Sequence, residues 1–184
     1  MKKLLKVMIA VSMIAVLAGC GSKSEEGKDI TFESAEDVLV QIYDSYDEDD
    51  KFPVAGGDSE NVTMDEPGEF NISNTEELDV MLGFPAAEAG SIDEAASMVH
   101  MMNANIFTGA AYHVTDGVNM DELADAVAAN ILERQWICGT PDTIIIAEAG
   151  EYMITAFGEA EIMDTFKDNI TKIGINVSVE EPIM

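Results

Sequence analysis

The side chains best suited to chemistry in this chain are a lone thiol, two imidazoles and many carboxylates. Cys138 has no second cysteine at Cys-x-x-Cys spacing, so thiol–disulfide exchange lacks a resolving partner. Pairing with His100 or His113 would activate it as a nucleophile, but the sequence does not show whether these residues meet. An isolated cysteine more often packs as a small hydrophobic residue. We favour that interpretation of Cys138.

A second candidate is a soft-metal site around His100. Met98, Met101 and Met102 lie within two residues of it, and thioether and imidazole ligands suit copper. In a strand, however, His100 shares a face with Met98 and Met102 only, and methionines in apolar segments usually fill gaps in a core. We therefore assign no metal here.

A third candidate is calcium binding by the acidic stretch that follows residue 43. An EF-hand counted from Asp44 needs glycine at its sixth position and glutamate at its twelfth, where this chain has Asp49 and Ala55. We therefore interpret residues 47–74 as a long solvated loop and expect 44–66 to be the least ordered part of the domain unless a cation binds. A looser calcium site is the alternative, with these carboxylates as candidates: Asp44, Asp47, Asp49, Asp58 and Asp65.

Recognised catalytic and cofactor motifs are missing from the sequence. Gly56-Gly57-Asp58 lacks the Lys-Ser/Thr of a phosphate loop, and the chain has no Gly-x-Ser-x-Gly, no His-Glu-x-x-His and no Rossmann glycine set. Among 36 acids, no single carboxylate pair stands out for glycoside chemistry. The sequence thus assigns no catalytic residue and no cofactor.

Caps and hydrophobic periodicity predict the elements that would position these residues. Ser34 caps a helix over 35–46, and Asn74 starts a short helix that ends before Gly83. Ser91-Ile92-Asp93-Glu94 has the pattern of a capping box and predicts one helical turn. Two strands follow with a turn near 103–105, and 106–114 is rich in strand-forming residues. The remaining predicted elements are a helix over 119–135 with Asn119 as its cap and Arg134 in its last turn, a hairpin of 143–148 and 152–157, a helix over 160–172, and a short edge strand from Ile175 to Val179.

This order predicts an α+β fold. We expect a four-stranded antiparallel sheet with helices 119–135 and 160–172 on one face, in the order ββαββα over residues 92–173. The N-terminal helix and the long acidic loop would precede it.

The N-terminus carries a recognisable leader. Lys2, Lys3 and Lys6 precede an apolar run of about 12 residues, too short for the roughly 20 that span a bilayer. Leu17-Ala18-Gly19-Cys20 then resembles the lipobox of bacterial lipoprotein signal peptides. The resemblance implies cleavage before Cys20 and a diacylglyceryl thioether on its sulfur, which would hold the chain on the extracytoplasmic face of the cell membrane. It divides the chain into a signal peptide (1–19), a flexible leash (20–29) and a single domain (30–184).

Charge narrows the choice of partners. Removing three leader lysines leaves six basic against 36 acidic residues, a formal charge of −30. Such a chain has no basic patch for nucleic acid, and anionic lipid repels it, so the lipid anchor must hold it at the membrane. A solvated surface explains most of the acidity, and an envelope protein or a cationic partner is the more specific alternative.

The lipobox and the ββαββα order together resemble a family of small bacterial envelope lipoproteins with a domain of unknown function. That resemblance implies an envelope location and no known activity. Our hypothesis is therefore a non-enzymatic, membrane-anchored accessory or binding module. The alternative is an envelope enzyme that uses Cys138 or a carboxylate pair.

Overall fold

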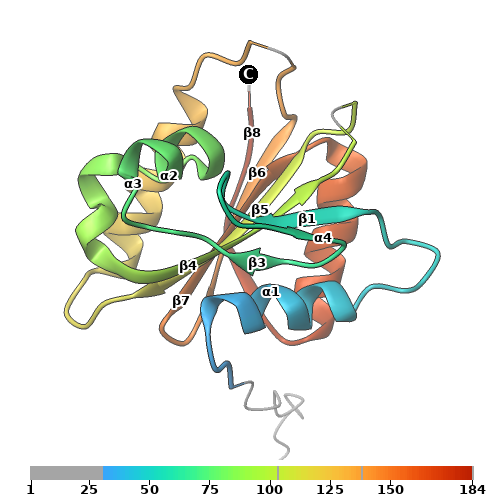
Figure 1. Ribbon diagram of the computed structural model, residues 1–184, viewed down its shortest axis with the longest axis horizontal. Coiled ribbons are helices and arrows are strands. Elements are labelled where there is room, and N and C mark those ends of the chain that lie inside the picture. The colour runs from blue at the N-terminus through green and yellow to red at the C-terminus, as the bar shows by residue number, and fades with distance from the viewer. Residues whose placement is uncertain (1–30, 103, 138, 184) are drawn as a thin grey trace, which may run out of the picture.

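One antiparallel sheet organises the chain, and helices cover both of its faces (Figure 1). The structure is a computed structural model that describes residues 31–102, 104–137 and 139–183. The sheet has eight strands in the order β2-β1-β4-β5-β7-β6-β8, with β3 also paired to β4. The strands are β1 (Val54–Gly57), β2 (Val62–Met64), β3 (Gly68–Glu69), β4 (Ile92–His100), β5 (Phe107–Val114), β6 (Thr143–Ala149), β7 (Tyr152–Gly158) and β8 (Asn176–Pro182).

The helices begin where side-chain oxygens cap them. Ser34 accepts a hydrogen bond from Asp37 N, Asn74 from Glu77 N, and Asn119 from Glu122 N, as their positions in the sequence predict. The helices are α1 (Ala35–Asp44), α2 (Thr75–Leu82), α3 (Met120–Leu132) and α4 (Ala160–Lys172), with a short 3-10 helix η1 (Ala86–Ser91).

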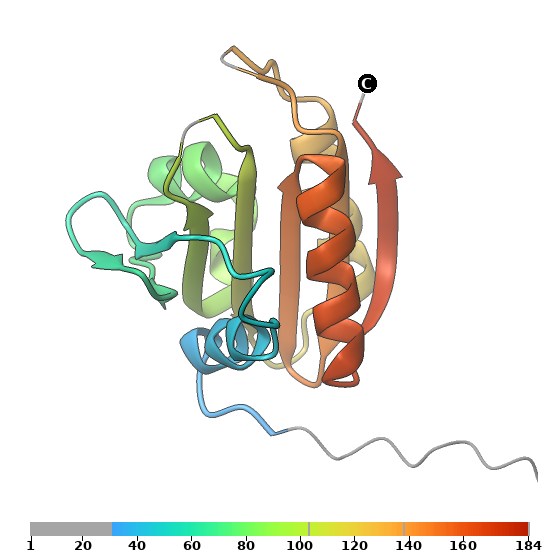
Figure 2. The same cartoon turned by 90° about the vertical axis from the view of Figure 1, so that its right-hand side faces the viewer.

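The central strands are buried on both sides. Ile144 and Ile146 of β6 face a core with α2 and α3, whereas Ile145 and Ala147 face a second core with α1 and α4. Figure 2 shows α4 along one face of the sheet, with β8 at the outer edge. The structure is therefore a three-layer sandwich.

The expected four-stranded sheet with two helices on one face is wrong. The hairpin of β6 and β7 forms in the expected place, but α3 and α4 pack on opposite faces and the sheet has eight strands. The sequence does indicate coverage of both faces, in the uninterrupted apolar run Ile144-Ile145-Ile146-Ala147. A strand that is buried on both faces does not alternate between apolar and polar residues.

The expected long loop over 47–74 is also wrong. Three short strands lie in it: β1 and β3 each pair with β4, and β2 pairs with β1. Their sequences of four, three and two residues are too short to show periodicity. β1 and β3 pair along the edge of β4 that β5 leaves free, and β2 adds to β1, because an open strand edge offers unpaired N–H and C=O groups to a further strand.

Two smaller expectations fail near α2. Ser91 ends η1 and β4 begins at Ile92, so the apparent capping box at Ser91 is part of no α-helix. Arg134 lies beyond α3 and complements a different helix, because its Nη2 donates to the carbonyls of Asp79 and Val80 near the end of α2, at 2.6 and 2.8 Å. The sequence did not predict this contact, because the two segments are more than 50 residues apart.

Candidate functional site

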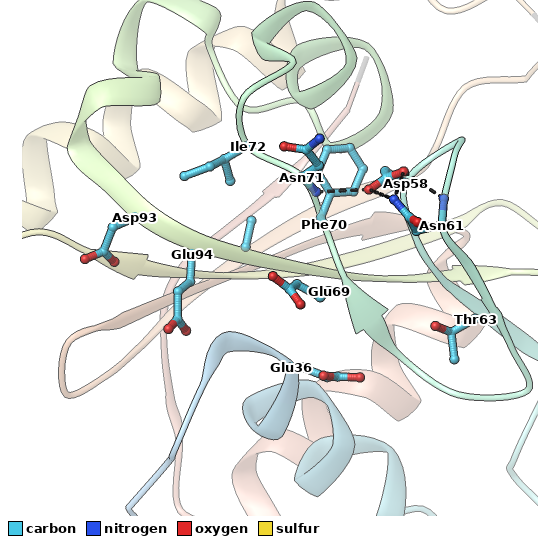
Figure 3. Close-up of a pocket in the computed structure, with 11 residues that line it drawn as sticks. Glu36, Asp58, Asn61, Thr63, Glu69, Phe70, Asn71, Ile72, Asp93 and Glu94 are labelled. Atoms are coloured by element: carbon cyan, nitrogen blue, oxygen red, sulfur yellow. Dashed lines mark hydrogen bonds between the residues drawn. The ribbon is translucent and has the colours of Figure 1, made fainter.

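A pocket of about 550 Å³ opens where the start of β4 faces α1 and the short strands (Figure 3). We call it the acid-lined pocket. Apolar side chains of Phe70, Ile72 and Ala95 contribute to its lining. Carboxylates from four separate segments also line it: Glu36, Asp58, Glu69, Asp93 and Glu94.

Asp58 anchors the wall of this pocket. Its side chain is only 3% exposed, and its Oδ1 accepts hydrogen bonds from the backbone N–H groups of Glu60 and Asn61 at 2.8 and 2.9 Å. Its Oδ2 accepts from Asn71 N at 3.2 Å (Figure 3). Burial alone would raise the pKa of Asp58, but these donated hydrogen bonds outweigh it and lower the pKa below its ordinary value. Asp58 therefore holds the loop as an ionised carboxylate.

Close backbone contact fixes the same wall. A Cβ placed on Gly56 would lie 2.0 Å from the backbone nitrogen of Gly68, so only glycine lets β1 and β3 approach this closely. Gly57 adopts φ +88°, a region that side chains avoid. Its carbonyl accepts a hydrogen bond of 2.8 Å from the buried Ser97 Oγ of β4. Together these contacts fix the wall that carries Glu69.

The other carboxylates keep capacity for a ligand. Glu94 Oε2 accepts a hydrogen bond from Ala35 N at 3.1 Å, at the start of α1. Glu36 and Glu69 make no side-chain hydrogen bond or ion pair within the described residues. No lysine or arginine of the described chain lines this pocket. The opening thus carries negative charge that the surrounding protein leaves largely uncompensated.

A histidine lies at one side of the pocket. His113 of β5 hydrogen-bonds Asp93 Oδ1 through Nδ1, and its Nε2 is 3.9 Å from a carboxylate oxygen of Glu151. The hydrogen bond to Asp93 raises the pKa of His113 above its ordinary value, and the charges of Glu94 and Glu151 act in the same direction against partial burial. Of the two histidines that the sequence offered as partners for Cys138, His113 is therefore the one beside the acid-lined pocket.

The carboxylates of the alternative calcium site do not converge. Both carboxylate oxygens of Asp58 already accept hydrogen bonds from backbone N–H groups, and Asp65 is an exposed turn residue with φ 65°. Asp44 ends α1, and Asp49 lines a separate pocket near His100. Across residues 31–102, 104–137 and 139–183, no three His, Cys, Asp or Glu side chains are grouped so that they could hold a metal ion.

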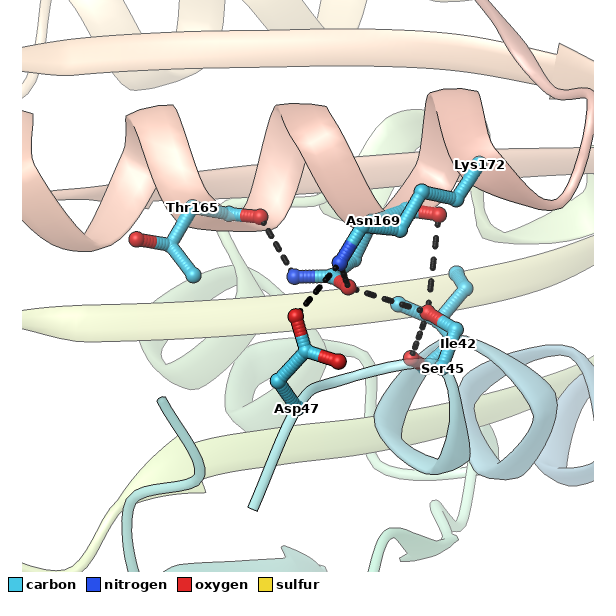
Figure 4. Close-up of polar contacts among 6 residues, drawn as sticks. All are labelled: Ile42, Ser45, Asp47, Thr165, Asn169 and Lys172. Atoms are coloured by element: carbon cyan, nitrogen blue, oxygen red, sulfur yellow. Dashed lines mark hydrogen bonds and ion pairs between the residues drawn. The ribbon is translucent and has the colours of Figure 1, made fainter. Parts of the chain in front are cut away.

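Asp47 has a structural partner instead (Figure 4). Its Oδ2 lies 3.3 Å from Lys172 Nζ at the end of α4, and this Nζ also donates to Asn169 Oδ1 at 3.1 Å. Asn169 is 1% exposed, and its Nδ2 donates to the carbonyl of Thr165. Ser45 Oγ, 3.4 Å from Asn169 Oδ1, completes a polar clasp between α1 and α4. Asp47, a candidate for the alternative calcium site, therefore helps to join two helices.

The remaining sequence candidates are dispersed. His100 ends β4, whereas His113 pairs with Glu94 near the beginning of that strand, so the two imidazoles lie at opposite ends of the sheet. Met98 is fully buried in the core, and Met101 and Met102 are exposed in the following turn. Cys20 and Cys138 lie outside the described residues.

Sequence reasoning missed the carboxylates that the fold brings together. Glu36 lies in the first turn of α1, Glu69 in a two-residue strand, and Asp93 and Glu94 in the segment interpreted as a capping box. No local pattern links residues 36, 69 and 94, and each acid alone resembles an ordinary surface residue. Only the uneven ratio of acids to bases pointed toward such a surface.

Comparisons with known proteins add no assignment to this geometry. No family model, no curated protein and no solved structure matches the chain. Among the described residues, no helix is both long enough and apolar enough to cross a bilayer.

Proposed function

We propose that this protein is a membrane-anchored extracytoplasmic lipoprotein, and that it acts as a non-enzymatic binding module for an organic cation carrying several amines. The resemblance of residues 17–20 to a lipobox supports the anchor. One observation carries the ligand class: several carboxylates surround a pocket of about 550 Å³ that no basic side chain of the described chain lines.

The spacing of the carboxylates favours an extended cation over a metal ion. Glu36, Glu69 and Glu94 come from α1, β3 and β4 and surround the opening instead of meeting at one point (Figure 3). An amine-bearing chain can reach such separated charges in turn. Its methylene groups would contact Phe70 and Ile72, and each buried methylene contributes about 0.8 kcal/mol.

The expected affinity is modest. Exposed ion pairs contribute about 0.2–1 kcal/mol each, so three pairs and about three methylenes give a dissociation constant on the order of a tenth of a millimolar to several millimolar. Without the three leader lysines the formal charge is −30 (six basic against 36 acidic residues), and this charge raises the local concentration of cations and speeds their approach. Binding should weaken as salt screens these charges.

Titration with spermidine tests the ligand class. The double variant Glu36→Gln/Glu69→Gln should bind it about tenfold more weakly in calorimetry. The matched control Asp125→Asn/Glu181→Gln removes the same charge from exposed positions outside the pocket, and it should change affinity by less than about twofold. Equal losses in both variants would show that spermidine responds only to net charge.

Intact mass tests the anchor separately. The membrane-bound protein should begin at Cys20 and carry acyl chains, and Cys20→Ser should lose the modification and the stable membrane attachment. A wild-type protein that is soluble and unmodified would contradict this part of the proposal without affecting the pocket.

A further inference from the structure

The other end of β4 contributes to a second pocket of very different character. It has a volume of about 570 Å³ and lies among the end of β4, the start of β5, the end of β7, the end of α2 and the segment after α3. We call it the Trp136 pocket. Its largest apolar lining residues are Met81, Ile106, Phe107, Trp136, Ile137 and Phe157.

No aspartate or glutamate appears among the described residues that line the Trp136 pocket. The chain has 36 acids against nine bases, so a pocket of this size without a carboxylate contrasts with the average surface. The charge present is positive, because Arg134 lines the pocket. An anion entering here meets local attraction within a protein that is otherwise negative.

Arg134 is held in place and retains donors. Its Nη2 donates to two carbonyls at the end of α2, and its guanidinium lies 5.3 Å from the ring of Trp136. A guanidinium has five N–H donors, and its other nitrogens make no hydrogen bond within the described residues. The nearest carboxylate, Asp79, is 3.9 Å from Nη2 and also accepts from Asn130. The guanidinium is thus positioned by the fold with hydrogen-bonding capacity left for a ligand.

His100 lines this pocket as a neutral side chain and contributes no positive charge to it. Its ring stacks on Phe52 at 4.9 Å, its Nδ1 accepts a hydrogen bond from Met102 N, and Nε2 is paired with the amide of Asn105. Burial lowers the pKa of His100, and the charge of Glu159 opposes that shift. A neutral imidazole holds the turn after β4 and leaves Arg134 as the cation of the site.

Apolar side chains at the rim are exposed in the part of the chain that the structure describes. Val80 is 64% exposed and Ile137 is 94% exposed, and both line the pocket. Met101 and Met102, two more of the six large hydrophobic side chains exposed in the described chain, lie in the adjacent turn. The buried Nε1 of Trp136 also finds no hydrogen-bond acceptor among the described residues. Concave apolar walls with a few polar groups are typical of small-molecule sites.

We infer that the Trp136 pocket binds a small organic carboxylate with an aromatic or aliphatic body. The planar guanidinium of Arg134 matches a carboxylate in shape and charge, and the walls formed by Phe107, Phe157 and Trp136 accept the apolar body. Because no carboxylate of the described residues lines this pocket, an anion meets less repulsion here than elsewhere on this protein. This inference is independent of the proposed cation site.

Tryptophan fluorescence provides a direct test, because Trp136 is the only tryptophan of the chain. The full-length protein in zwitterionic nanodiscs is titrated with 4-phenylbutyrate, 4-phenylbutanol and 4-phenylbutylamine, which share one body and differ in charge. The acid should change the emission saturably, and the alcohol and amine should bind at least tenfold more weakly. Tighter binding of the amine, or no saturable change with the acid, would overturn the inference.

A pair of rim variants separates local from global charge. Ile137→Asp places a carboxylate at the exposed rim and should weaken phenylbutyrate binding at least tenfold. Val62→Asp adds the same charge at another exposed position, 57% accessible and outside the pocket, and should change binding less than twofold. Equal effects of the two variants would overturn the inference.

Variants of Arg134 test the recognition group itself. Arg134→Gln should reduce phenylbutyrate affinity to that of the alcohol, and Arg134→Lys should recover part of the loss. Unchanged discrimination between acid and alcohol in a folded Arg134→Gln protein would overturn the inference. Because Arg134 also supports α2, melting curves establish folding, and the rim pair decides the question if this variant does not fold.

Discussion

The two ends of one strand, β4, contribute to pockets of nearly equal size and opposite chemistry. Asp93 and Glu94 at its beginning line the acid-lined pocket of about 550 Å³, and Val99 and His100 at its end line the Trp136 pocket of about 570 Å³. Among the described residues, several carboxylates and no lysine or arginine line the first pocket, whereas Arg134 and no carboxylate line the second. The net charge of the chain therefore describes neither pocket, because acids gather at one end of β4 and Arg134 lies at the other.

The two pockets also differ in how their walls are held. Backbone contacts form the wall of the acid-lined pocket, through the close approach of Gly56 to Gly68 and the hydrogen bonds to Asp58. Side-chain packing forms the Trp136 pocket, with Arg134 between α2 and Trp136. Backbone changes should damage the first wall most, and the following variants test this difference.

The largest effect is expected from Gly56→Ala. The new Cβ would meet backbone atoms of Pro67 and Gly68 at 2.3 and 2.0 Å, and backbone cannot rotate away as a side chain can. We expect a loss of about 3 kcal/mol, the upper end for overpacking, and a fall in melting temperature of about 6–12 °C. Below the transition, Trp136 emission should stay native.

Gly90→Ala is the control for that variant. Its Cβ would have no atom within 4 Å, so its melting temperature should stay within about 2 °C of wild type. Equal melting temperatures of the two variants would show that the contact between β1 and β3 is not tight.

A smaller loss is expected from Asp58→Asn, which weakens the acceptor for three backbone donors. Leaving buried donors unsatisfied costs about 1–3 kcal/mol, measurable by urea unfolding at pH 7. Because the folded pKa of Asp58 lies below its ordinary value, its stabilisation is complete above about pH 4 and is lost as pH falls through the folded pKa.

The difference between wild type and Asp58→Asn should therefore shrink in acid. Asp65→Asn is the control, since Asp65 is exposed and asparagine tolerates its positive φ. A difference that stays constant below pH 3 would contradict the role assigned to the ionised Asp58.

The two histidines test the contrast between the two ends of β4, with an expected effect on stability smaller than that of Asp58→Asn. In NMR titrations, His113 should titrate above the ordinary value of about 6.5, because Asp93 favours its charged form, and His100 should titrate below it, because burial disfavours the charge. The pair between His113 and Asp93 then stabilises the fold below pH 6.5, and this contribution is lost as pH rises through the folded pKa of His113.

Substitution by glutamine distinguishes the two signals. His113→Gln should remove the higher titration and change stability by less than about 1 kcal/mol, since the pair is surface-exposed. The reverse order of the two titrations would contradict the electrostatic contrast between the two ends of β4.

The smallest effects concern calcium and Asp47. The side chains of Asp47 and Lys172 are 79% and 47% exposed, so Asp47→Asn should cost less than about 0.5 kcal/mol. Melting curves in millimolar calcium, in magnesium and in sodium at matched ionic strength should coincide within about 1–2 °C, because unspecific screening acts alike for all. A rise with calcium alone would reveal a specific site through mass action.

Elements with strong local signals were predictable. Caps at Ser34, Asn74 and Asn119 act within three residues of the chain, and the turn after Ala149 lets β6 pair with β7 immediately. Such contacts need no knowledge of the rest of the fold. The short strands β1, β2 and β3 were not predictable, since they depend on the exposed edge of β4.

The candidate sites were less predictable than the elements. The calcium hypothesis grouped acids that are close in sequence, such as Asp44, Asp47 and Asp49, and the fold sends their side chains to different surroundings. The pocket instead unites Glu36, Glu69 and Glu94, which are far apart in sequence. Carboxylates in different elements share no periodicity, so only pairing and packing bring them together.

Composition and short-range patterns account for the lipobox-like motif, the excess of acids, the helix caps and the hairpin, because each depends on composition or on neighbours within a few residues. The assembled sheet sets which face each helix covers and which carboxylates surround one opening. It also places Arg134 against α2, beside a pocket that no carboxylate of the described residues lines. These features arise from contacts between segments distant in sequence, whose free energy exists only after the sheet has assembled.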